Sequence, residues 1–188
     1  MNTKKLMDEI LAILRSIQND EKKLKLLHDF MMKEIYDESE LEEIPEKYKK
    51  VIFEIAGNLL VGFTCFFNLE TLEVESIPQK MIDDPEEFEM ITGEKYTDAE
   101  MKHLQWQKYI EVEPMESHEA FKVMEYFIDE VDDDNLQNKL TNALNRNKPF
   151  ANFKYIVETS EYRQKWFDFR QKQWELYVWD TLKTGINT

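Results

Sequence analysis

Two arginines lie within an aromatic stretch near the end of the chain. Arg163 and Arg170 are seven residues apart, which places them on one side of a helix at about 100° per residue. Trp166 and Trp174 fall on the same broad arc. An arginine on a core-facing arc must find an acidic partner or reach water, because an unpaired buried charge costs several kcal/mol. This arrangement has two interpretations: an internal ion pair, or an anion or peptide-carboxylate site lined by aromatic rings.

The ion-pair interpretation needs carboxylates on a neighbouring helix. The predicted helix 117–131 supplies Glu125, Asp129 and Glu130, and short connections between the following helices keep it near the last one. We expect these groups to be the structural partners of both arginines, which would then be largely desolvated. In the alternative interpretation, the two arginines and the two tryptophans bind a ligand.

No other residues show the spacing of a catalytic or metal-binding motif. His28, His103 and His118 are isolated in the sequence, and Cys65 lies in an apolar stretch where a thiol is expected to be buried and slow to react. The acidic run 132–135 lacks the glycine and the glutamate of a calcium-binding loop. We therefore predict no catalytic residue, no metal site and no cofactor, and an enzymatic role is the less favoured one.

Composition narrows the class of protein. The 188 residues carry a formal charge of −15 and 42% hydrophobic residues, enough for one fair-sized core. This charge repels nucleic-acid phosphates and anionic membranes, so direct binding to either is not expected. No apolar run approaches the ~20 residues of a membrane span. A single cysteine excludes an intramolecular disulfide and favours a reducing compartment, so we expect a cytoplasmic protein.

Apolar residues at helical spacing predict an accessory element at the start of the chain. Leu6, Ile10 and Ile13 recur at intervals of three and four, and a second such helix follows after a short connection. We expect a helical hairpin over residues 1–37 that docks on the core or on another copy of the chain. An acidic linker, 38–45, follows it.

Residues 46–188 are predicted to form one α+β core domain that is mostly helical. Charge-free or alternating stretches at 63–68, 73–77 and 108–113 predict a small three-stranded antiparallel sheet. The sheet is expected to pack against a C-terminal helical region. The last helix of that region is predicted at 161–183, with Gly185 ending it.

Several of these segments resemble a known family. They are Cys65–Val74, Met124–Ile128, Leu140–Leu144, Pro149–Lys154 and Trp166–Phe169. Together they resemble the bacterial uncharacterised protein family 158, over roughly residues 63–77 and 108–183. This chain departs from the family pattern at Leu72, where a turn glycine is expected, and at Lys148-Pro149, where a Gly-Ala pair is expected. The family has no assigned activity, so the resemblance implies a fold and no catalytic residue.

Three functions remain open from the sequence. The first is a non-enzymatic protein-interaction or regulatory module that binds another protein or itself through the hairpin or the aromatic C-terminal face. The second is a nucleic-acid-related regulator, either by direct binding or as an acidic mimic of phosphate. The third is an enzyme with an unrecognised site near Arg163 and Arg170.

Overall fold

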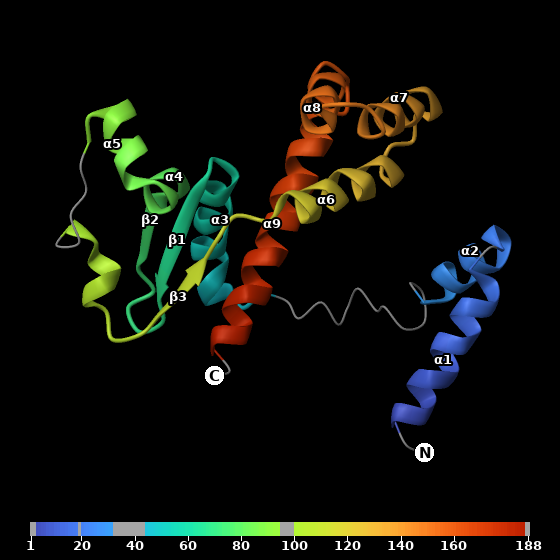
Figure 1. The fold of residues 1–188 in the computed structure, drawn as a ribbon, viewed down its shortest axis with the longest axis horizontal. Coiled ribbons are helices and arrows are strands. Elements are labelled where there is room, and N and C mark those ends of the chain that lie inside the picture. The colour runs from blue at the N-terminus through green and yellow to red at the C-terminus, as the bar shows by residue number, and fades with distance from the viewer. Residues whose placement is uncertain (1–2, 19, 32–43, 95–99, 187–188) are drawn as a thin grey trace. The chain divides into compact units, whose positions relative to one another are not determined.

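The computed structural model of the protein describes residues 3–18, 20–31, 44–94 and 100–186 (Figure 1). The chain divides into two compact units, Met1–Ile44 and Pro45–Thr188, called unit 1 and unit 2 below. The last six residues of the predicted hairpin lie outside the described residues, as does the predicted linker apart from Ile44 and Pro45.

The described part of unit 1 is a pair of helices. α1 spans Thr3–Ile17 and α2 spans Glu21–Phe30. The side chain of Asp20 caps α2 by accepting a hydrogen bond from the backbone N–H of Lys23 at 3.2 Å. The two helices pack against each other, so the predicted helical pair is present.

The described part of unit 2 contains one small antiparallel sheet. Its strands are β1, Phe63–Asn68; β2, Val74–Pro78; and β3, Tyr109–Val112, in the order β2-β1-β3. Cys65 of the central strand lies opposite Ser76 on one side and Val112 on the other. The predicted three-stranded sheet is therefore confirmed, and the fold is α+β and mostly helical, as predicted.

Helices make up most of the remainder of unit 2. They are α3 (Glu46–Leu60), α4 (Gln79–Asp83), α5 (Pro85–Thr92), the 3-10 helix η4 (Lys102–Gln105), α6 (Ser117–Asp129), α7 (Asp134–Leu144), α8 (Pro149–Glu158) and α9 (Arg163–Ile186). Pro149 occupies the first turn of α8, where its missing N–H costs nothing. Asp133 caps α7 by accepting from the N–H groups of Asn135 and Leu136.

The last helix connects two parts of the core. Near its start, Trp166 meets the rings of Phe127 from α6 and Phe153 from α8, with centroids 5.0 and 5.1 Å away. Towards its end, α9 packs against α3 and β3, and Leu182 is fully buried there (Figure 1). The small sheet and the C-terminal helices are thus joined through one long helix.

The C-terminal end of α9 differs from the sequence prediction. Gly185 does not end the helix, which continues through Ile186. A Cβ atom at Gly185 would lie only 2.5 Å from Cδ1 of Ile110 on β3. The glycine therefore allows a close approach between helix and strand, and the prediction of a stop at this position was wrong.

Candidate functional site

Helix α9 places the two predicted site arginines in different environments. Arg163 is exposed, and its guanidinium carbon lies 4.8 Å from the ring centre of Phe167. Arg170 is partly buried, with its guanidinium carbon 5.7 Å from the ring of Trp166 and 5.4 Å from that of Phe167. Both cations therefore stack over aromatic rings, but only Arg170 is withdrawn from water.

The predicted carboxylate partners do not meet either arginine. Glu125, Asp129 and Glu130 are exposed, and within the described residues neither arginine forms an ion pair with any of them. A carboxylate oxygen of Glu130 instead lies 3.9 Å from Nζ of Lys165. The prediction of an ion pair with α6 is therefore wrong. The physical reason is that α6 turns Val123, Met124 and Phe127 toward the core, which leaves its acidic residues on the solvent side.

A pocket of about 230 Å³ lies beside Arg170. Its walls come from α3, α6, α8 and α9, and the predicted site residues Trp166, Trp174 and Arg170 all line it, whereas Arg163 does not. Lys154 of α8 is the second cation in the wall, and the other lining residues are apolar. The structure thus brings together three of the four predicted site residues.

The guanidinium of Arg170 has no polar partner among the residues that the structure describes. Its Nε atom is buried, and the described residues provide neither a hydrogen bond nor an ion pair to this side chain. Burial lowers the pKa of Arg170, and the nearby carboxylate of Glu158 opposes part of this effect. Glu158 itself lies 3.9 Å from the ammonium group of Lys154, its neighbour one turn earlier on α8. Arg170 therefore presents a positive charge to an apolar pocket without a bonded anion.

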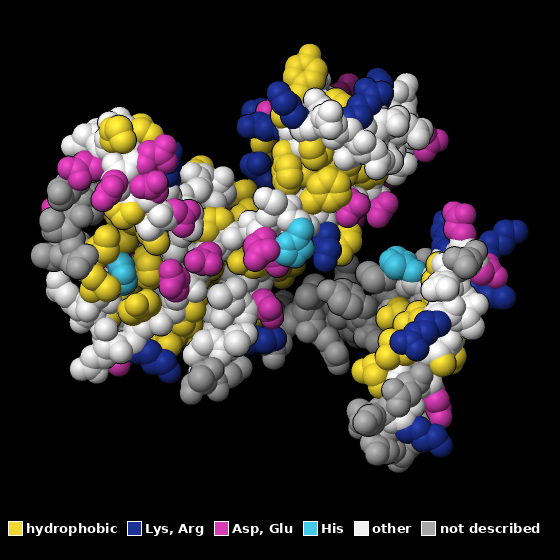
Figure 2. Space-filling model, in the orientation of Figure 1, with side chains coloured by type: hydrophobic (Ala, Val, Ile, Leu, Met, Phe, Trp, Pro, Cys, Tyr) yellow, Lys and Arg dark blue, Asp and Glu magenta, His cyan; other side chains and the backbone are white. Residues whose placement is uncertain are grey.

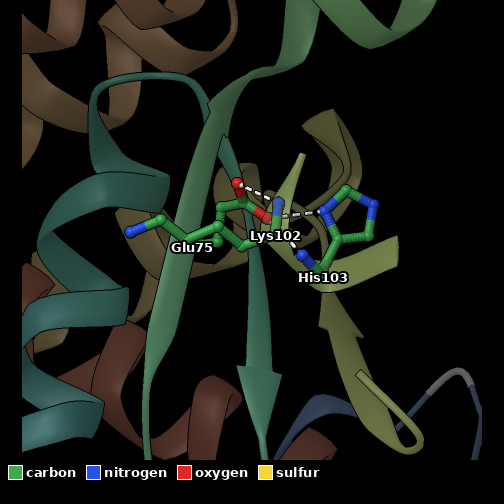
Figure 3. Close-up of polar contacts among 3 residues, drawn as sticks. All are labelled: Glu75, Lys102 and His103. Atoms are coloured by element: carbon green, nitrogen blue, oxygen red, sulfur yellow. Dashed lines mark hydrogen bonds and ion pairs between the residues drawn. The ribbon is translucent and has the colours of Figure 1, made fainter. Parts of the chain in front are cut away.

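A second cluster of polar groups surrounds the carboxylate of Glu75 on β2 (Figure 3). The backbone N–H of Lys102 donates to it at 2.8 Å, and the backbone N–H and Nδ1–H of His103 both donate at 2.7 Å. His103 is 5% exposed, and its imidazole stacks on Phe66 with ring centroids 3.7 Å apart. Burial raises the pKa of Glu75, but the hydrogen bonds from His103 and Lys102 outweigh it, and the net pKa is lowered.

The Glu75–His103 cluster secures η4 against the sheet. All three donors come from residues 102 and 103, so one carboxylate fixes both the backbone and the ring of this short helix. The histidine was visible in the sequence, but its partner lies 28 residues earlier and has no motif spacing to it. Only the alternation of residues 73–77 indicated that Glu75 belongs to a strand.

Cys65 is fully buried in β1, as predicted. Its Sγ atom lies 3.4 Å from the hydroxyl oxygen of Ser76, and Asn58 of α3 donates to the same hydroxyl at 2.9 Å. Burial raises the pKa of the thiol to about 11. A thiol in this environment is almost entirely protonated at neutral pH and is a poor nucleophile.

Potential metal ligands do not converge. In the part of the chain that the structure describes, no three of the His, Cys, Asp and Glu side chains form a group that could hold a metal ion. His118 lies 3.1 Å from the exposed carboxylate of Glu116 at the start of α6, which is a surface contact. Over the same described residues, no helix combines the length and apolar character needed to cross a membrane.

The fold and the pocket define an acidic α+β protein whose last helix carries a cationic, aromatic site. A comparison with protein families found a match for the C-terminal half of the chain. Residues 94–186 match the uncharacterised protein family (UPF0158), and this part of the chain belongs to that family. The match covers all of the second segment of the resemblance, 108–183, and does not include the first, 63–77. Searches of curated proteins and of solved structures found no match.

Proposed function

We propose that this protein is a non-enzymatic interaction module that associates with a second copy of itself through its N-terminal helices. The observation that carries the proposal is the apolar surface of unit 1. Large hydrophobic side chains are exposed along both helices (Figure 2). The exposed residues are Leu6, Met7, Ile10, Leu11, Ile13, Leu24, Leu26, Phe30 and Met31. Together they amount to roughly several hundred Å² of apolar surface, which is large for a surface that stays in water.

These side chains form a continuous stripe on α1. At 100° per residue, the large apolar residues from Leu6 to Ile17 fall within an arc of about 160°. Ile10 near the centre of that arc is 45% exposed, and Ile13 at its edge is 58% exposed, so α2 covers only part of the stripe. A 15-residue helix with this pattern is marginal alone and gains its stability from a packing partner.

Charge favours a second copy as that partner. Residues 3–31 contain six basic and five acidic side chains, whereas the whole chain carries −15. Two copies can therefore approach through unit 1 with little repulsion, while their acidic remainders repel each other. Two hairpins that face each other would form a four-helix bundle, which buries both apolar stripes.

Two further properties belong to this proposal. A buried, unpaired cysteine with a raised pKa suits a reducing compartment, which supports a cytoplasmic location. The acidic surface of the whole chain supports a protein partner over nucleic acid.

The mass of the particle in solution tests the proposal. Light scattering coupled to size exclusion should give twice the chain mass for the full protein and a single mass for a chain that lacks residues 1–44. Ile10→Lys, near the centre of the stripe, should weaken the dimer at least about tenfold, since a charge replaces an apolar group that the dimer buries. Ser16→Lys adds the same charge to the exposed polar side of α1 and should leave the mass unchanged. A full-length monomer, or a dimer that survives the deletion, would refute the proposal.

A further inference from the structure

We propose that the pocket beside Arg170 binds a small organic carboxylate with an apolar body. The carboxylate would pair with the guanidinium of Arg170, and the apolar body would occupy the space between α3, α6, α8 and α9. The site lies entirely within unit 2, so it does not depend on the proposed association through unit 1.

The chemistry of the walls selects the ligand class. Eight of the ten lining residues are apolar, the other two are Lys154 and Arg170, and no carboxylate is among them. A neutral apolar ligand would leave the guanidinium desolvated and unpaired, which is costly. A small hydrophilic anion such as phosphate would leave the rings of Trp166 and Trp174 without a contact. A molecule with one carboxylate and an apolar body satisfies both parts of the pocket.

The geometry of Arg170 suits a carboxylate in particular. Its guanidinium stacks over Trp166 and Phe167, which fixes the plane of the fork. Its Nε atom is buried and forms no hydrogen bond within the described residues. A carboxylate that enters the pocket can accept from the two terminal N–H groups in parallel, a bidentate arrangement that suits the guanidinium fork. The ligand would thus provide the acceptor that α6 does not.

Size limits the ligand to a small molecule. The pocket volume of about 230 Å³ admits a body of roughly ten heavy atoms. An eight-carbon fatty acid anion, octanoate, matches this size and serves as the probe. For a ligand of ten heavy atoms, a dissociation constant on the order of 0.1 to 1 mM is expected.

Titration with three probes tests the site. Octanoate, octanamide and acetate separate the contributions of charge and apolar body, and tryptophan fluorescence reports binding because Trp166 and Trp174 line the pocket. We expect saturable binding of octanoate only. Octanamide binding as tightly as octanoate, or no saturation by octanoate below about 5 mM, would overturn the proposal.

Two arginine variants form a matched pair. Arg170→Met keeps the apolar stem of the side chain but removes its charge-assisted contact with the carboxylate. It should therefore weaken octanoate binding at least about tenfold. Arg163→Met removes an equally stacked but exposed arginine outside the pocket, and it should change the affinity less than twofold. An equal loss in both variants would show that octanoate does not use the pocket.

A second measurement covers the case in which Arg170→Met does not fold. In the unaltered protein, the ¹⁵Nε–H resonance of Arg170 should shift on addition of octanoate and stay in place with acetate. Ala120→Leu, which fills the apolar part of the pocket and leaves Arg170 unchanged, should abolish that shift. A resonance that does not respond to octanoate contradicts the proposed pairing.

Discussion

The carboxylate of Glu75 accepts three hydrogen bonds, so the charge of this side chain affects the stability of the protein. Glu75→Gln leaves a single acceptor oxygen for donors from Lys102 and His103, so we expect a loss of about 1–3 kcal/mol at pH 7 in urea denaturation. Glu73→Gln changes the exposed neighbour in the same way and should cost less than about 0.5 kcal/mol.

The contribution of Glu75 to the free energy of unfolding should decrease as the pH falls. Its pKa in the folded protein lies below the ordinary value of 4.5, so its contribution is complete above about pH 4.5 and is lost as the pH falls through the lower, folded pKa. The stability difference between the unaltered protein and Glu75→Gln should therefore shrink on acidification. A difference that stays constant from pH 7 to pH 3 would contradict this account.

Cys65 should react slowly with thiol reagents in the folded protein. Its pKa of about 11 and its complete burial leave almost no accessible thiolate at pH 8. Labelling with a chromogenic disulfide should proceed only at the rate at which the protein opens, and it should accelerate by orders of magnitude in denaturant. Immediate labelling under native conditions would show that β1 is accessible.

Lys148 adopts a backbone conformation that favours glycine. It has φ of 58°, and the other non-glycine residue with positive φ among the described residues is Leu72. Both are positions where the family resemblance predicts a glycine. At each of them the chain therefore has a side chain in a backbone conformation that is sterically unfavourable for residues with a Cβ atom. Lys148→Gly should raise the free energy of unfolding by about 0.5–1 kcal/mol, the strain relieved less the added freedom of the unfolded chain.

A glycine introduced inside a helix gives the matched comparison. Lys139→Gly, in the exposed middle of α7, should lower stability by about 1 kcal/mol. Chemical denaturation of both variants separates the two effects. A destabilised Lys148→Gly would mean that this position carries little strain.

At the scale of elements, the contact between α9 and β3 depends on one small residue. Gly185→Ala would bring a Cβ to 2.5 Å from Cδ1 and 2.7 Å from Cγ1 of Ile110, and we expect it to cost about 1–2 kcal/mol as the strand and helix separate. Gly57→Ala, inside α3 with open space around the new Cβ, should instead stabilise by about 0.5–1 kcal/mol. Thermal unfolding of the two variants should shift in opposite directions.

Local sequence patterns predicted the helices and strands better than they predicted the contacts between side chains. The sheet was predictable because alternation and aromatic content act within a few residues, and the helical starts at Asp20 and Pro149 follow from local hydrogen-bonding rules. The partners of Arg170 were not predictable, because the rotation of α6 about its own axis depends on the whole core. The role of Gly185 was predicted wrongly for a different reason: a helix end and a close packing contact both favour glycine, so the residue type does not distinguish them.

At the scale of the whole molecule, we expect that the family segment does not fold on its own. Residues 94–186 include β3 but not β1, its pairing partner in the sheet, and they exclude α3. A chain of residues 94–188 alone should therefore show no cooperative thermal transition, whereas residues 45–188 should unfold in one step. Near-ultraviolet circular dichroism during heating distinguishes the two, and a sharp transition in the shorter chain would contradict this prediction.

The packing of α3 against α9 also has a consequence for synthesis on the ribosome. α3 ends at Leu60 and α9 begins at Arg163, so roughly a hundred residues are added between the two halves of this contact. At cellular elongation rates this takes on the order of 5 to 20 s. During that time Ile52, Ile55 and Leu59 have no α9 to cover them. The nascent chain is therefore a ready substrate for chaperones that bind apolar segments, until its last helix emerges.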